Sequence, residues 1–62
     1  MKYFVTLHGE EMFSNLTKKE AINKANKLYE KVNNTLSIGI GKIKYIKGAK
    51  YYTCLPLHFY ND

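Results

Sequence analysis

The sequence contains no tryptophan, arginine or glutamine, and only one cysteine and one proline among its 62 residues. A single cysteine excludes an internal disulfide framework, which small secreted domains usually need. We therefore expect a reducing compartment, the cytoplasm. No stretch approaches the roughly 20 apolar residues of a membrane span. The alternating residues after Met1 do not resemble the apolar core of a signal peptide, so we expect no membrane partner.

The chain is short but has the composition of a folded domain. Apolar residues make up 45% of it and charged residues 24%, which indicates a globular chain and not a disordered one. We predict one domain over residues 1–62. A domain of this size buries only about 60% of its unfolded surface, which leaves little material for the walls of a catalytic cleft.

The charge is strongly positive and is supplied by one residue type. The formal net charge is +5, and all ten basic residues are lysine. A basic chain favours polyanionic partners such as nucleic acid or an acidic protein surface. Lysine neutralises phosphates but cannot reproduce the bidentate reading of guanine by arginine, which disfavours sequence-specific DNA recognition. Lysine that serves only solubility is the alternative.

The first half of the chain predicts a strand followed by a helix. Residues 2–8 alternate as in a half-buried strand, and residues 10–16 are expected to form a loop. Thr17 and Glu20 have the spacing of a capping box, and Asn33-Asn34 is suited to end the helix. The residues at helical spacing between these caps form one core-facing stripe: Ala21, Ile22, Ala25, Leu28, Tyr29 and Val32.

The second half predicts two strands, over residues 36–46 and 50–60. The apolar phase changes at Gly41-Lys42, which suggests a β-bulge or bend. Lys47-Gly48 is a plausible hairpin turn. Pro56 cannot donate a main-chain hydrogen bond, so the last strand is expected to be unpaired on one side, bulged or ending there.

These elements predict an α+β domain of βαββ order. A right-handed crossover makes the first two strands parallel, and the third strand fits between them in a mixed three-stranded sheet of order 1-3-2, with the helix packed on one face. The other face then carries Phe4, Tyr52 and Tyr60 without a covering layer. Such a face is typical of an interaction surface, and we expect it either to bind a partner or to form a homodimer.

Three groups of residues contain the residue types of reactive or ligand-binding sites. The run Gly39-Ile40-Gly41-Lys42 lacks the spacing and the following helix of a phosphate loop. His8, Glu10, Glu11 and His58 have no metal-binding spacing. Cys54 lacks a nearby base, since His58 would lie some 13 Å along the same strand. We predict no catalytic residue, no metal site, no cofactor and no small-molecule substrate.

Lysine and tyrosine supply the predicted binding residues. Lys24, Lys27 and Lys31 form a basic face on the helix, which is also typical of a plain solvated face. Lysines and tyrosines interleave between Lys42 and Tyr52, a pattern shared by protein interfaces, by single-strand binders and by ordinary hairpins. We expect Phe4, Tyr52 and Tyr60 to anchor a partner, and Lys44, Lys47 and Lys50 to steer its approach.

The abundance of Lys, Asn, Tyr and Ile is typical of an A/T-rich genome, such as that of a low-GC bacterium or its phages and plasmids. In size and in its layout of strand, capped helix and terminal hairpin, the span from Lys2 to Tyr60 resembles small phage accessory proteins of the anti-CRISPR and anti-defence kind. The resemblance lies in no motif and assigns no residue a role. It implies a non-catalytic inhibitor that blocks a host protein complex by stoichiometric binding. The alternative is a small basic nucleic-acid-binding protein of low sequence specificity.

Overall fold

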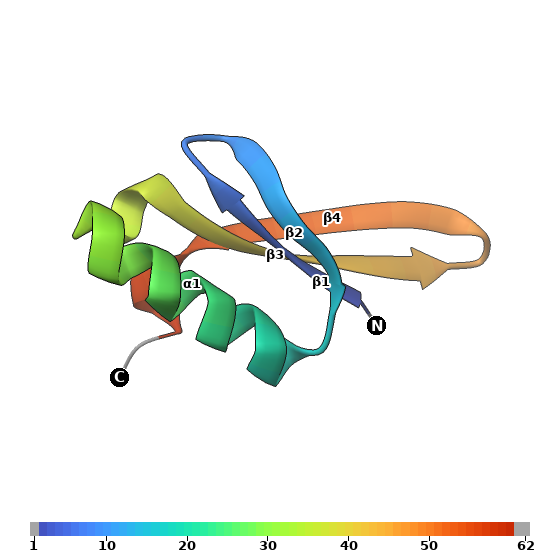
Figure 1. The fold of residues 1–62 in the computed structure, drawn as a ribbon. Helices are drawn as coiled ribbons and strands as arrows, with labels where there is room; N and C mark the ends of the chain where they lie inside the picture. Colours follow the sequence, from blue (N-terminus) through green and yellow to red (C-terminus); the bar gives the residue numbers. More distant parts are fainter. Residues whose placement is uncertain (1, 61–62) are drawn as a thin grey trace.

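The computed structural model describes residues 2–60, which form one sheet with a helix packed on one face (Figure 1). The elements in chain order are β1 (Lys2–Leu7), β2 (Glu10–Leu16), α1 (Lys18–Val32), the 3-10 helix η1 (Thr35–Ser37), β3 (Ile38–Ile46), β4 (Ala49–Pro56) and the 3-10 helix η2 (Leu57–Phe59).

The sheet has four strands in the order β2-β1-β3-β4, and every neighbouring pair is antiparallel. The predicted three-stranded sheet of order 1-3-2 is therefore wrong. Because β2 and β3 both run antiparallel to β1, they run parallel to each other on its two sides. The crossover through the helix joins β2 to β3. The prediction applied the rule for parallel strands to β1 and β3, whereas it holds for β2 and β3.

Strand β2 occupies the segment that we predicted to be a loop. A two-residue turn at His8 and Gly9, both with positive φ (52° and 84°), reverses the chain into it. The register against β1 shifts on either side of Val5, and Asn15 has a positive φ of 62°. These irregularities leave Phe13 and Leu16 as the residues packed against the core, so the two-residue alternation that marks a strand is missing.

Helix α1 has the predicted caps. The Thr17 hydroxyl accepts a hydrogen bond from the Glu20 N–H (3.2 Å), and Glu20 Oε1 accepts one from the Thr17 N–H (3.0 Å). At the other end Asn33 adopts the left-handed conformation (φ 55°), and its N–H donates to the Tyr29 carbonyl at 2.7 Å. The helix therefore begins and ends where local sequence signals place it.

The core lies between α1 and the sheet. Among residues 2–60, six hydrophobic residues are fully buried: Val5, Ala21, Ala25, Ile38, Ile40 and Leu57. The two alanines let the helix approach the sheet closely. The predicted last strand, residues 50–60, ends at Pro56, and η2 turns Leu57 into the core. Leu55, the residue before Pro56, is 38% exposed.

The β3–β4 hairpin extends past the rest of the sheet. The last pair between β1 and β3 is Lys2 with Ile43, so no third strand of the described chain lies beside residues 44–51. We call these residues the hairpin arm. It lies at the opposite end of the sheet from the His8-Gly9 turn and contributes to an elongated shape of 38 × 20 × 20 Å (Figure 1). Lys47 and Gly48 form its turn with positive φ, as predicted.

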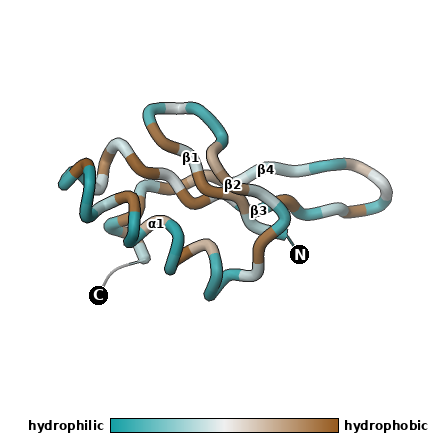
Figure 2. The backbone as a smooth tube through the Cα atoms, viewed as in Figure 1, coloured by the Kyte–Doolittle hydropathy of each residue, from teal (hydrophilic) through white to brown (hydrophobic). Residues whose placement is uncertain are grey.

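Strand β3 is regular, and the predicted bulge at Gly41-Lys42 is wrong. Its pairing proceeds one residue at a time without a shift, with β1 from Ile38 to Ile43 and with β4 from Gly39 to Ile46. The apolar residues switch to the other alternate positions of the strand because the arm extends beyond the core. Beyond Gly41 apolar residues no longer have to face the helix, and apolar and hydrophilic residues alternate out to the tip of the hairpin (Figure 2).

Candidate functional site

The sheet face opposite the helix is uncovered over the described residues. The register places four cross-strand rows on this face. We call it the uncovered face, and its residues on β1, β3 and β4 are Lys2, Phe4, Thr6, Gly39, Gly41, Ile43, Tyr45, Lys50, Tyr52 and Cys54. It joins the central strands to one side of the hairpin arm. Of the predicted binding residues, it brings Phe4, Lys50 and Tyr52 together.

The Phe4 ring lies across Gly41. A Cβ at residue 41 would overlap the ring, so only glycine at this position lets the ring lie flat on β3. Tyr52 meets Phe4 edge to face, with ring centroids 6.5 Å apart and planes at 76°. Such aromatic pairs contribute about 0.5–1.5 kcal/mol beyond their burial. The absent side chain at Gly41 thus fixes an aromatic pair across three strands.

Lys50 and Tyr52 form a second contact on this face. The Lys50 ammonium lies 4.9 Å from the centre of the Tyr52 ring, within the range of a cation–π contact. Hydrogen bonding with the Tyr52 side chain, followed by its charge, raises the pKa of Lys50 above its ordinary value. Lys50 therefore carries its charge at neutral pH and holds it beside an aromatic ring that is 62% exposed.

The remaining predicted binding residues do not share this face. Lys44 lies on the opposite side of the hairpin arm, because it pairs with Tyr51 and alternates with Ile43 and Tyr45. Lys47 lies in the turn at the tip of the arm. Tyr60 follows η2 and packs against the buried cluster, where burial raises the pKa of its hydroxyl. The predicted position of Tyr60 beside Phe4 and Tyr52 is not the one observed.

The three helix lysines do not form a uniform stripe. Lys24 is half-buried, and its ammonium lies 5.1 Å from the centre of the Phe13 ring on β2. Lys27 and Lys31 are exposed. Lys24 therefore packs at the edge of the core against Phe13. This contact was not predicted because Phe13 belongs to β2, which we expected to be a loop.

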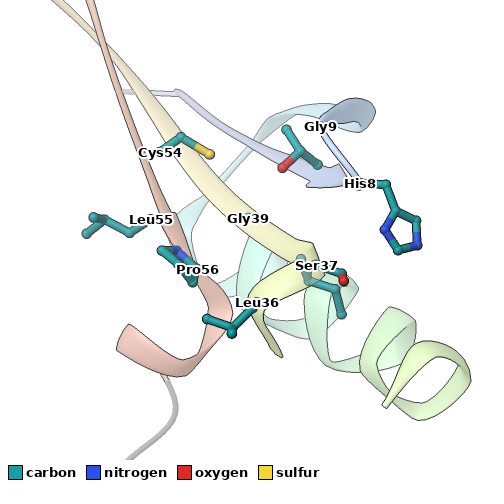
Figure 3. A pocket seen from close by; sticks show the side chains of 10 residues that line it. His8, Gly9, Leu36, Ser37, Gly39, Cys54, Leu55 and Pro56 are labelled. Carbon is teal, nitrogen blue, oxygen red and sulfur yellow. The ribbon is translucent and has the colours of Figure 1, made fainter. Parts of the chain in front are cut away.

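A pocket of about 460 Å³ opens at the end of the sheet near the His8-Gly9 turn (Figure 3). Its lining includes Thr6, His8, Ser37, Gly39 and Cys54. A Cβ at Gly39 would come within 2.5 Å of Thr6 Oγ1 and 2.9 Å of Cys54 Sγ, so the space between these side chains depends on glycine. Cys54 is an exposed free thiol.

The histidines and carboxylates that we considered as metal ligands lie apart. His58 is in η2, where its ring stacks on Phe59 with centroids 4.4 Å apart, whereas His8 is in the first turn of the sheet. Among residues 2–60 no group of three or more His, Cys, Asp or Glu side chains could hold a metal ion.

Ile43 and Tyr45 belong to the uncovered face and were missed by sequence reasoning. Their signal was the shared parity of Gly39, Gly41, Ile43 and Tyr45, which a regular strand places on one side. We interpreted the same pattern as a bulge because we expected apolar residues to keep facing the core.

In comparisons with known proteins, no family model matches the chain, and neither the curated proteins nor the solved structures give a significant match. Among the described residues, no helix has both the length and the apolar character needed to cross a membrane.

Proposed function

We propose that this protein is a non-catalytic binding protein that occupies an acidic surface of a host protein complex with its hairpin arm and the adjoining uncovered face. Blocking by occupancy is the mode that the resemblance to small phage anti-defence proteins implies. The observation that carries the proposal is the hairpin arm itself, a projecting element that combines exposed aromatic residues with a single sign of charge.

The arm is unusually rich in exposed apolar surface. Tyr45 is 66% exposed and Tyr51 53%, and Ile46 beside them is also exposed. Because these side chains are largely exposed in the monomer, their burial adds little to its stability. Tyrosine is over-represented among the residues that dominate protein interfaces, and the two strands hold these rings at fixed spacing.

The charge of this half of the molecule supports an acidic partner. No aspartate or glutamate occurs between Glu30 and Asp62, whereas four lysines lie on or next to the arm: Lys42, Lys44, Lys47 and Lys50. A patch of one sign speeds the encounter with an oppositely charged surface and disfavours partners of like charge.

A second candidate function rests on the neighbouring side chains of Tyr45, Lys50 and Tyr52 on the uncovered face, where Tyr45 pairs with Lys50 and Tyr52 lies two residues further along β4. Exposed rings beside an ammonium on an open sheet are suited to stack bases and to neutralise phosphates. In this reading the protein binds single-stranded nucleic acid with low sequence specificity. Because Lys50 already lies against the Tyr52 ring, a base could stack there only if the lysine moved aside.

The test is affinity capture from a low-GC bacterial lysate with and without nuclease, using the wild-type protein and a Tyr45→Ala/Tyr52→Ala variant. We expect a protein complex that survives nuclease treatment and is lost with the variant. Tyr29→Ala, which removes a tyrosine of the helix, is the matched control. Nucleic acid captured without nuclease, with no stable protein after nuclease, would instead establish the second candidate and overturn the first.

A homodimer is the alternative use of the uncovered face. It would bury Phe4 and Tyr52, and sedimentation of the wild-type protein against a Phe4→Ala variant would detect it. We also propose the cytoplasm as its compartment, because the chain has one cysteine and its thiol is exposed.

A further inference from the structure

The two edges of the sheet differ in how well they could accept another strand. On the β2 edge the register shifts twice, Asn15 has a positive φ, and Glu10 and Glu11 add charge. Bulges and charges are the usual devices that prevent edge pairing. On the β4 edge the register runs unbroken from Ala49 to Pro56, and residues 49–55 are all exposed. Only the second edge is open to pairing.

Antiparallel geometry identifies the free main-chain groups of β4. In a hairpin closed by a two-residue turn, the flanking residues form a hydrogen-bonded pair, and such pairs alternate along the strands. Counted from Ile46 and Ala49, the main-chain groups of Lys50, Tyr52 and Cys54 point away from β3. Pro56 comes next in this series and has no N–H to offer, so the free edge ends there.

We propose that the β4 edge binds an acidic, extended segment of a partner protein as a fifth strand of the sheet. This inference rests on the proposed function and specifies how the partner is held. The outward N–H and C=O groups of Lys50, Tyr52 and Cys54 supply the hydrogen bonds, as in other cases of strand addition. The same three residues place their side chains on the uncovered face, so one segment contacts both the edge and the face.

Charge selects an acidic occupant. Lys50 is the one charged residue of β4, and Lys42 and Lys44 lie on the neighbouring strand β3. A carboxylate opposite Lys50 forms a cross-strand ion pair of the kind that adds roughly 0.2–1 kcal/mol. A second copy that paired through its own β4 would bring another Lys50 and no acidic residue. The acidic strand of a second copy, β2, has the irregular register described above.

The sequence of the bound segment should alternate between acidic and apolar residues. On the side of the uncovered face its side chains lie next to Lys50 and Tyr52, where carboxylates fit best. On the other side they lie next to Tyr51 and Thr53, where β-branched apolar residues fit. A suitable probe is a short peptide of alternating valine and glutamate, with alternating valine and lysine as its charge-reversed control.

Amide hydrogen exchange of the full chain, followed by NMR, tests the inference directly. In the free protein the N–H groups of Lys50, Tyr52 and Cys54 should exchange fast, while those of Tyr51, Thr53 and Leu55 are protected by pairing with β3. Excess valine–glutamate peptide should slow exchange of the first three amides at least tenfold, and the lysine peptide should not. Peptide binding that leaves these three amides unprotected would overturn the inference.

A main-chain variant provides an independent check. Cys54→Pro removes an N–H that points away from β3, so the β3–β4 pairing should survive and affinity for the peptide should fall at least tenfold. Cys54→Ala removes the same thiol, keeps the N–H and should bind as the wild type does. If Cys54→Pro fails to fold, a peptide N-methylated on the residues facing β4 removes the same hydrogen bonds from the other side. Undiminished binding of that peptide would refute strand addition.

Two other outcomes would replace the inference. Protection of the three amides that rises with protein concentration and needs no peptide would mean that a second copy occupies the edge. A single-stranded oligonucleotide that displaces the peptide and binds more tightly would assign the surface to nucleic acid. A cellular partner that Cys54→Pro still captures would refute strand addition alone, whereas wild-type protein that captures no partner after nuclease would refute the proposed function.

Discussion

Phe4 lies directly over Gly41 of the neighbouring strand, and its ring reaches across β3 to meet Tyr52 on β4. This contact joins three strands on the face that the helix does not cover. Gly41 is buried under the ring, whereas Tyr52 is largely exposed. The exposed ring of Tyr52 on the proposed binding surface is therefore held by a contact with Phe4 on the central strand β1.

Gly41→Ala should destabilise the protein through Phe4. The new methyl group would overlap the ring, and overpacking of this kind typically costs about 1–3 kcal/mol. Urea unfolding of Gly41→Ala, Phe4→Ala and the double variant forms a double-mutant cycle. We expect the alanine at 41 to cost much less when Phe4 is already absent. An equal cost in both backgrounds would mean that the ring is not what excludes a side chain at this position.

Leu57→Ala should be among the most damaging single substitutions. Leu57 is fully buried, although it comes after the last strand, and truncation of a buried leucine costs about 2–5 kcal/mol. Phe59→Ala is the matched control, because it removes a larger side chain that is 61% exposed. Thermal unfolding by circular dichroism should show a large decrease in Tm for the first variant and little change for the second. The reverse order would contradict the turn at Pro56.

The capping box gives helix α1 a pH dependence. The hydrogen bond from the Thr17 N–H holds the pKa of Glu20 below its ordinary value of 4.5. The folded state then prefers the ionised carboxylate, so this stabilisation is present above the unfolded pKa and is lost as the pH falls through the folded value. Glu20→Gln keeps a side-chain acceptor without the charge. The stability difference between wild type and variant should shrink on acidification, and a difference that does not change with pH would contradict this account.

Local signals in the sequence predicted helix α1 and both hairpin residues at Lys47-Gly48 correctly, because caps and turns depend on residues close together in the chain. Strand β2 could not be found in this way. Its inward residues Phe13 and Leu16 are spaced by bulges that exist only against β1. Without β2, we predicted that β3 runs parallel to β1, and the predicted strand order was wrong as well. Both properties depend on how many times the chain reverses direction before β3.

The candidate site was predicted in part for the same reason. Phe4 and Tyr52 were placed on one face by two-residue alternation alone, which holds within each strand. Tyr60 was misplaced because the strand was extended through Pro56, and Tyr45 was missed because the core was assumed to continue along β3. Where a strand leaves the core is a property of the sheet as a whole, and no local pattern reports it.

Tyr52→Ala should weaken binding of the protein partner more than any other single substitution on the uncovered face. It removes the ring that contacts both Phe4 and Lys50, and buried interface tyrosines of this kind often contribute about 2 kcal/mol or more. Titration calorimetry with the captured partner measures the effect, and thermal unfolding checks that the fold is kept. Affinity within error of the wild type would remove Tyr52 from the anchor residues.

The position of the lysines, and not their number, should govern association. Replacing Lys44, Lys47 and Lys50 by alanine lowers the formal charge from +5 to +2, and replacing Lys18, Lys19 and Lys27 at the helix does the same. Because steering acts through the local field, only the first variant should lose association rate, by about tenfold at low salt, and should lose its salt dependence. Stopped-flow association with the captured partner over a range of salt concentrations separates the two. Equal slowing in both variants would mean that net charge alone attracts the partner, and the hairpin arm would then have no special role in the encounter.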